Sequence, residues 1–408
     1  MARLERIVER LELKEFQLRA LLEVTKAINN NVDQAQLLKL YEGIVKEQLG
    51  ITRLTLYVNS GGWQCMLAYG TAGATPEVDV SQVFGKFKDI QVIDSETLGS
   101  LGAFDVAVPV YHREKPLAFL LIGDIDEEQH RISPTVKHLN FIQTLTNLIV
   151  VAIENRRLAR QELQQQRDDR ELELAAEMQA MLIPRDLPKG NGVNAAGWYQ
   201  PHRLVGGDYY DLFQIDENVI FLCVADVSGK GIAASLLMSN FQASLRALAK
   251  YSGGSLIDLV HDLNERVYAN ARGERFITLF LGRMDMHTRT FEFINSGHND
   301  PLLHDAGKIT SLHDGSIALG MMPKLPFLRS GSVQIPLAAT LLCYTDGLIE
   351  QEDKDGGSFE TGPLEKALLM NASKGPEAVI AGLRDAFTRH RGTMPYLDDI
   401  AVLTCTFG

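Results

Sequence analysis

Residues 219–231 decide the fold of this chain, and they read Val-Ile-Phe-Leu-Cys-Val-Ala-Asp-Val-Ser-Gly-Lys-Gly. The apolar run predicts a buried strand that ends at Asp226, and the glycines after it predict a flexible turn. A second apolar run, residues 341–345, ends in the same way at Asp346 and is also followed by glycine. Carboxylates at the ends of buried strands are costly where they converge without a counter-charge.

Three further acids fit this pattern. Asp208 follows two glycines, and the adjacent Asp398 and Asp399 open the last apolar run of the chain. Neighbouring side chains of a strand point to opposite faces, so one of these two should face the site and the other should not. Hard divalent cations bound by carboxylate oxygens are the usual compensation for converging acids. The sequence therefore predicts a two-metal hydrolytic site in the C-terminal half.

Other polar residues nearby have simpler interpretations. Lys230 lies between glycines, but the loop lacks the spacing of a phosphate-binding P-loop, so we expect a solvated lysine. His298 could serve in acid–base chemistry or only pack in a turn. We expect Asp211 at the surface. Asp226 and Asp346 could each also be acids that only form a turn.

Composition limits the class of protein. The chain has 408 residues, of which 45% are hydrophobic and 23% charged, so we expect a soluble globular protein of two or three domains. A formal net charge of -12 argues against nucleic acid or an anionic membrane as the main partner. The four cysteines form no CxxC pair, and the N-terminus has no apolar signal core. We expect reduced thiols and a cytoplasmic protein.

The chain is expected to contain two domains and a linker. Residues 1–155 combine helices, two hairpins and a long closing helix that begins near Ser133, an α+β pattern that resembles the GAF sensory domain. Such a domain either binds a small ligand or only dimerises, and both readings stay open. Residues 156–188 predict a polar helical linker or weak coiled coil, which either passes a signal or only separates the domains.

Residues 189–408 are expected to fold as an α+β sandwich with helices on the sheet faces. The expected strands are 219–225, 276–284, 290–296, 301–304, 332–335, 340–345 and 400–407, and the expected helices are 232–250, 255–270, 363–370 and 376–389.

Six motifs occur in a fixed order at residues 205–211, 225–231, 276–280, 295–299, 344–350 and 398–400. Over about residues 170–408 their order and spacing resemble the PPM-type (type 2C-like) serine/threonine phosphatases of the bacterial RsbU/SpoIIE branch. The helical segment at 171–184 is similar to the helix that precedes this domain in that branch. Asp300 is a departure, because relatives usually carry a second proline there, and it indicates a loop change.

The resemblance implies a C-terminal α-β-β-α sandwich and a site with two Mn²⁺ or Mg²⁺ ions. Asp226 would bridge the ions and Val227 would offer its backbone carbonyl. Asp346 and Asp398 match the other metal-binding acids, and Asp208 matches an acid that binds metal directly or through water. Asp399 stands where relatives carry Asp or Asn, so either Asp398 or Asp399 is the ligand.

The resemblance also implies hydrolysis of phosphoserine or phosphothreonine in a protein. In this branch the substrate is usually a phosphorylated anti-anti-sigma protein with a STAS fold, which acts in a partner-switching pathway. A homodimer formed through the linker and the N-terminal domain, with activity set by that sensor domain, is expected as well. Two alternatives are a catalytically inactive scaffold that binds phosphoproteins and a metal-dependent nucleotide phosphodiesterase.

Overall fold

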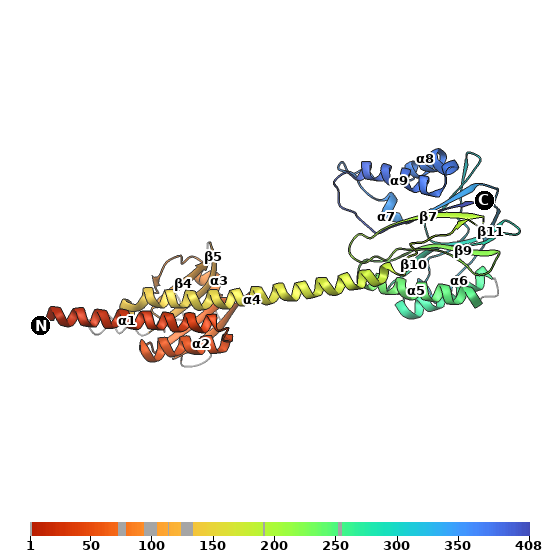
Figure 1. The fold of residues 1–408 in the computed structure, drawn as a ribbon. Coiled ribbons are helices and arrows are strands. Elements are labelled where there is room, and N and C mark those ends of the chain that lie inside the picture. The colour runs from red at the N-terminus through yellow and green to blue at the C-terminus, as the bar shows by residue number, and fades with distance from the viewer. Residues whose placement is uncertain are drawn as a thin grey trace. The chain divides into compact units, whose positions relative to one another are not determined.

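The computed structural model of the protein describes residues 2–71, 79–93, 104–112, 114–123, 134–190, 192–251 and 255–408 (Figure 1). The chain divides into two compact units, Met1–Gln166 and Arg167–Gly408. Helix α4 (Pro134–Ala180) runs without a break through this division. Ser133, the expected start of this helix, lies outside the described residues. Among the described helices, none combines the length and the apolar character that a membrane crossing requires.

The N-terminal unit is built on an antiparallel sheet of five strands in the order β2-β1-β5-β4-β3. The strands are β1 (Arg53–Asn59), β2 (Trp63–Tyr69), β3 (Gln91–Val92), β4 (Val106–His112) and β5 (Lys115–Gly123). Helices α1 (Ala2–Asn29), α2 (Gln34–Glu42) and the first part of α4 cover one face, where Val24, Tyr41 and Ile149 pack with strand residues. Helix α3 (Val80–Phe84) covers the other face. The α+β order expected for this region is therefore present.

The middle of α4 is exposed on all sides within the described chain. Every residue from 158 to 171 is exposed, and apolar burial resumes towards the end of the helix. This pattern follows from the composition, because a stretch of Gln, Arg, Asp and Glu has no apolar stripe to bury.

The C-terminal unit contains two packed sheets. One has the strand order β14-β11-β10-β9-β8, with β15 paired to β11, and the other has the order β13-β12-β16-β17-β7-β6. The strands are β6 (Lys189–Gly190), β7 (Val193–Gln200), β8 (Tyr209–Gln214), β9 (Val219–Val227), β10 (Ile277–Asp285), β11 (Thr290–Ser296), β12 (Leu302–Asp305), β13 (Lys308–Ser311), β14 (Gly315–Ser316), β15 (Gly331–Gln334), β16 (Ala339–Tyr344) and β17 (Ile400–Phe407).

Helices cover the outer faces of both sheets, which gives four layers (Figure 1). Helices α5 (Ile232–Tyr251) and α6 (Leu256–Ala271) pack on the first sheet in a core that includes Met238 and Leu263. Helices α8 (Gly362–Asn371) and α9 (Pro376–Arg391) pack on the second sheet, around Phe387. The predicted α-β-β-α sandwich is confirmed.

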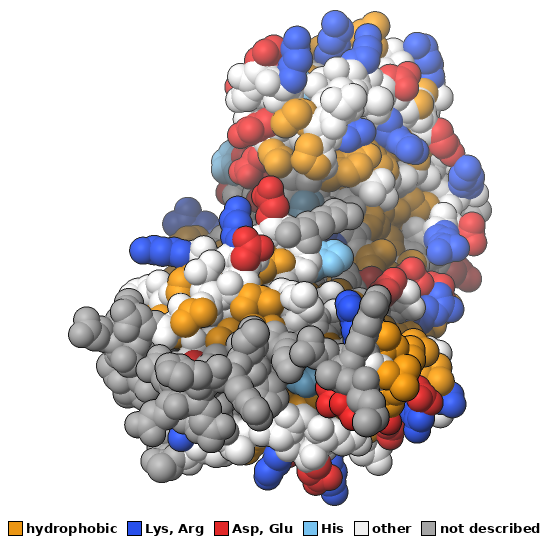
Figure 2. Space-filling model, turned by 90° about the vertical axis from the view of Figure 1, so that its left-hand side faces the viewer, with side chains coloured by type: hydrophobic (Ala, Val, Ile, Leu, Met, Phe, Trp, Pro, Cys, Tyr) orange, Lys and Arg blue, Asp and Glu red, His pale blue; other side chains and the backbone are white. Residues whose placement is uncertain are grey.

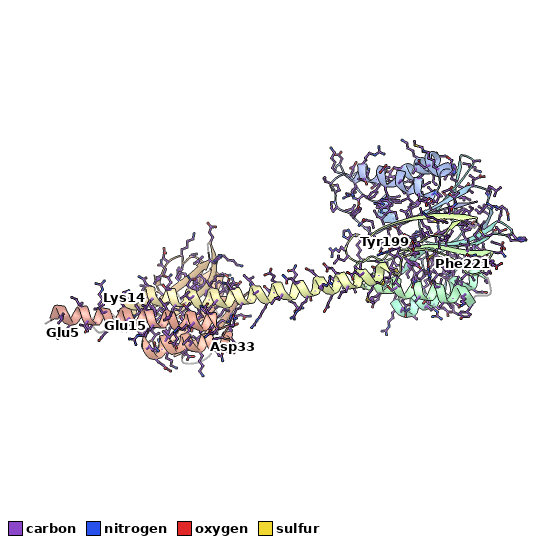
Figure 3. The ribbon with its side chains drawn as sticks, viewed as in Figure 1. Glu5, Lys14, Glu15, Asp33, Tyr199 and Phe221 are labelled. Atoms are coloured by element: carbon purple, nitrogen blue, oxygen red, sulfur yellow. The ribbon has the colours of Figure 1, made fainter. Side chains whose placement is uncertain are left out.

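Most expected elements occur within a few residues of their predicted bounds, but β7 and β8 were not predicted. Strand β7 contains Asn194 and Gly197, and β8 contains a buried acid, Asp211, so neither shows the usual apolar alternation. Both strands matter for the site, because the loop between them carries Asp208. Tyr199 marks β7 and Phe221 marks β9 in Figure 3.

Candidate metal centre

Asp226 lies at the penultimate position of β9, paired across the sheet with Thr278 of β10. Its side chain is partly buried. Burial is the main cause that raises the pKa of Asp226 to about 7, and the charge of Asp346 is the next, with further contributions from Asp398 and Asp399. Acids from three separate parts of the sequence, at positions 226, 346 and 398–399, therefore lie close enough to influence one another.

Asp208 is the most deeply buried of the predicted acidic ligands, with 1% of its surface exposed. Burial, followed by the charge of Asp226, raises the pKa of Asp208 well above its ordinary value. Two carboxyl groups so close to each other disfavour each other's charged form. The hydroxyl of Thr345 donates a hydrogen bond to Asp208 Oδ2 at 2.6 Å.

Asp346 opens the short helix α7 (Asp346–Ile349), directly after β16. Burial raises the pKa of Asp346, the charges of Glu350 and Asp398 raise it further, and the charge of Lys230 lowers it. Val227 is buried at the end of β9, and its carbonyl oxygen would lie 3.0 Å from a Cβ built on Gly207. The loop that leads to Asp208 thus passes close to that carbonyl.

The two neighbouring acids before β17 have different surroundings. Both oxygens of Asp399 accept backbone hydrogen bonds, Oδ1 from His202 at 2.7 Å and Oδ2 from Gly207 at 2.6 Å. Asp398 Oδ2 instead lies 2.7 Å from Lys230 Nζ, and Asp398 Oδ1 accepts the Asp399 amide at 2.8 Å. Asp399 therefore anchors the loop at 202–207, while the carboxylate of Asp398 remains beside the other acids.

This donor set fits hard divalent cations, which prefer carboxylate and carbonyl oxygens. Within the described residues, however, no group of three or more His, Cys, Asp or Glu side chains is arranged to hold a metal ion as it stands. The ammonium group of Lys230, 2.7 Å from Asp398 Oδ2, offsets part of the negative charge instead. A cation bound by Asp398 would thus compete with this lysine contact.

Lys230 is exposed, as expected, and it also donates to the carbonyl of Leu397 at 2.7 Å. The expectation for Asp211 was wrong. Asp211 is fully buried and receives two hydrogen bonds from Arg246, at 2.7 and 2.9 Å. In the sequence, Asp211 resembles a surface acid because no basic residue lies near it. Its partner, Arg246 on α5, is 35 residues away.

His298 has a packing role in this structure. It is buried, its Nδ1 lies 2.9 Å from the Thr278 hydroxyl, and its amide donates to Asn295 Oδ1 at 2.8 Å. Burial lowers the pKa of His298 to about 4, so the imidazole is neutral near pH 7. Thr345 is a site residue that the sequence analysis missed, although its position just before Asp346 at a strand end is a usable signal.

Comparison with known proteins agrees with the fold and the family resemblance that the sequence motifs indicate. The family "Stage II sporulation protein E (SpoIIE)" matches residues 216–408. Protein IcfG of Synechocystis sp. is 26% identical over 263 residues, which cover 57% of this chain and 41% of IcfG. The phosphoserine phosphatase RsbU of Bacillus subtilis is 24% identical over 228 residues, 55% of this chain and 67% of RsbU. The chain thus spans about two fifths of one relative and two thirds of the other.

Among solved structures, the SiaA-PP2C domain of Pseudomonas aeruginosa superposes with a TM-score of 0.53 at 19% identity, covering 60% of this chain and 98% of that domain. The fold of the C-terminal unit is therefore that of a PPM-type serine/threonine phosphatase domain, also called PP2C. Within this class, residues 216–408 are similar to the SpoIIE family, whose model they match.

Proposed function

We propose that this protein is a metal-dependent protein phosphatase that hydrolyses phosphoserine or phosphothreonine. The observation that carries the proposal is the convergence of Asp208, Asp226, Asp346 and Asp398, because burial, followed by the charges of neighbouring acids, raises the pKa values of the first three. Converging carboxylates destabilise the folded state unless cations compensate their charge. The family of the C-terminal unit supports the same reading.

We assign the ligands as follows. Asp226, Asp346 and Asp398 would hold the two ions together with the backbone carbonyl of Val227. Asp208 would bind an ion directly or through water. Asp399 is an anchoring residue and not a ligand, because backbone amides occupy both of its oxygens.

Two Mn²⁺ or Mg²⁺ ions, when bound, supply a nucleophile from water near neutral pH and neutralise charge on the phosphoryl group. The residues of the chain hold and orient this centre. Asp226 and Asp346 extend from the ends of β9 and β16, one strand from each sheet, so the rigid sandwich fixes their separation. Thr345 keeps Asp208 beside them. Positioning of this kind supplies much of the acceleration of phosphoryl transfer.

The substrate we propose is a phosphorylated anti-anti-sigma protein with a STAS fold, acting in partner switching. This proposal is supported by the likeness to the phosphoserine phosphatase RsbU. We further propose that the N-terminal unit is a GAF-like sensory or dimerisation domain, that the protein is a cytoplasmic homodimer, and that α4 is the linker through which this unit sets activity.

Release of phosphate from p-nitrophenyl phosphate tests the activity directly. The wild-type protein is expected to need Mn²⁺ or Mg²⁺, and Asp226→Asn should lower the rate at least about 100-fold, because bound cations supply several kcal/mol. Asp262→Asn, at an exposed acid on α6, is the matched control and should leave the rate unchanged.

Each alternative predicts a different result in the same assay. An inactive phosphoprotein-binding scaffold would release no phosphate with either metal, although it would still bind the phosphorylated partner. A nucleotide phosphodiesterase would prefer bis(p-nitrophenyl) phosphate or a cyclic nucleotide to the monoester. Equal rates for wild type and Asp226→Asn would end the metal-site assignment.

A further inference from the structure

Gln351 is a buried polar residue between two of the acid-bearing segments, and the proposed chemistry does not use it. Its exposed fraction is 0%. Its Nε2 donates to the carbonyl oxygens of Glu352 and Pro395, both at 3.1 Å, and its Oε1 accepts the amide of Leu397 at 3.3 Å. Both donors of the side-chain amide and its acceptor oxygen therefore have partners.

The backbone of Gln351 is fixed relative to helix α7. Glu350, directly before it, donates its amide to the carbonyl of Asp346 at 2.9 Å and so closes the turn that begins at this acid. The carbonyl of Gln351 accepts the amide of Phe359 at 3.0 Å and Nε2–H of His390, on α9, also at 3.0 Å. Because a trans peptide leaves only two soft rotations per residue, Gln351 can move little unless α7 moves with it.

The side-chain amide holds the other segment at two points. Pro395 and Leu397 flank Tyr396, whose own carbonyl lies 2.7 Å from His202 Nδ1. Leu397 directly precedes Asp398 in the chain. A shift of the Leu397 amide would therefore pass to the carboxylate of Asp398 through only a few rotatable bonds.

We propose that Gln351 is a positioning residue for the metal centre. Its amide ties the backbone just before Asp398 to the backbone just after α7, which begins at Asp346, and so sets the separation of these two carboxylates. The inference rests on the proposed function, since it assigns Gln351 a part in cation binding at that site. Small displacements matter there, because a misplacement of about 1 Å can cost about 100-fold in rate.

The test compares Mn²⁺ affinity by isothermal titration calorimetry in the full-length protein. Gln351→Met keeps the length of the side chain but removes its hydrogen bonds to Glu352, Pro395 and Leu397. Loss of a group that orients a metal ligand typically weakens affinity about 10- to 100-fold, and we expect a change of that size.

Gln334→Met is the matched control for this comparison. Gln334 lies on β15 of the same unit and donates a hydrogen bond to the Thr290 hydroxyl at 2.8 Å, but its side chain is exposed. This variant also exchanges a hydrogen-bonded glutamine for methionine, and it should bind Mn²⁺ as wild type does.

A purely structural role would give a different pattern. If Gln351→Met lowers the melting temperature of the metal-free protein but binds Mn²⁺ as tightly as wild type, the inference is overturned. The expected pattern is weaker binding together with a turnover number on p-nitrophenyl phosphate that returns towards wild type at saturating Mn²⁺. Failure of the wild-type protein to bind Mn²⁺ would instead remove the proposed function.

A second variant keeps the test decisive if Gln351→Met does not fold. Gln351→Asn retains a buried amide, but its side chain is one methylene shorter and cannot reach both Pro395 and Leu397 from the same backbone position. We expect a loss of Mn²⁺ affinity smaller than that of Gln351→Met. A wild-type dissociation constant for Gln351→Asn would overturn the inference.

Discussion

Asp226 is the residue at which burial and function conflict most directly. Its pKa in the folded, metal-free protein is raised from 3.8 to about 7, mainly by burial and then by neighbouring acids. Between these two values the folded state binds more protons than the unfolded state. Stability in the absence of metal therefore falls as the pH rises from about 4 to 7, and cations reverse that loss.

Asp226→Asn should therefore stabilise the metal-free protein while abolishing activity. At pH 7.5 in EDTA, we expect its melting temperature to exceed that of wild type by about 2–8 °C, and the difference should shrink towards pH 5. Differential scanning calorimetry at both pH values measures this. A variant that is less stable than wild type at pH 7.5 would contradict the raised pKa.

Asp211 contributes to the stability of the fold and not to the metal centre. Its carboxylate is fully buried and joins β8 to Arg246 of α5 by two hydrogen bonds. Asp211→Asn should lower the free energy of unfolding by about 2–3 kcal/mol, because Asn cannot satisfy the guanidinium equally. Urea unfolding measures the change.

The exposed pair of Arg170 and Glu173 on α4 is the control for this experiment. Glu173→Gln should change stability by less than about 0.5 kcal/mol, because exposed ion pairs contribute little. Equal losses for the two variants would show that Asp211 is not specially placed.

At the scale of elements, helix α7 holds Asp346 by packing against the start of β17. A Cβ built on Gly347 would lie 2.0 Å from the carbonyl oxygen of Asp399 and 3.0 Å from Asp398 Cβ. Glycine at this position lets the two acid-bearing segments approach each other. The Asp-Gly pair therefore serves close packing as well as a turn.

Gly347→Ala should displace the start of β17, lower stability by about 1–3 kcal/mol and weaken Mn²⁺ binding. Gly362→Ala, at the first residue of α8, is the control, because a Cβ there meets nothing within 4 Å. That variant should be neutral or slightly stabilising. Urea unfolding and Mn²⁺ titration of both variants provide the comparison, and wild-type behaviour of Gly347→Ala would refute the packing argument.

The sequence predicted those elements whose signals are local. The apolar runs that end at Asp226 and Asp346 were recognisable because burial on both faces gives continuous hydrophobic strands. Strand β8 was not, since the burial of Asp211 depends on Arg246, 35 residues away. The contact of Gln351 with Leu397 could not be predicted for the same reason: no periodicity relates an amide side chain to the distant backbone that it binds.

At the scale of the whole molecule, the division at Gln166 suggests where the chain can be cut. We expect residues 167–408 to fold alone and to retain metal-dependent hydrolysis of p-nitrophenyl phosphate, since both sheets of the sandwich lie within them. Circular dichroism and the phosphate-release assay check this. An unfolded fragment would contradict the division into two units.

Among the described residues that Figure 2 draws in colour, acidic and basic side chains are interspersed on this face. Long-range steering of a charged partner by this face is therefore expected to be weak, because opposite charges within a Debye length cancel. Recognition of a phosphoprotein would then depend on contacts close to the centre.

The four thiols differ in a way that is useful in the laboratory. Cys65, on β2 of the N-terminal unit, is exposed, whereas Cys223, Cys343 and Cys405 are buried between the sheets. Burial raises the pKa of all four thiols, so exposure is what distinguishes Cys65. Thiolates are the reactive species, so maleimide dyes should label the native protein at Cys65 alone. The unaltered chain thus offers one fluorescent reporter position, outside the phosphatase unit, for watching that unit respond to effectors.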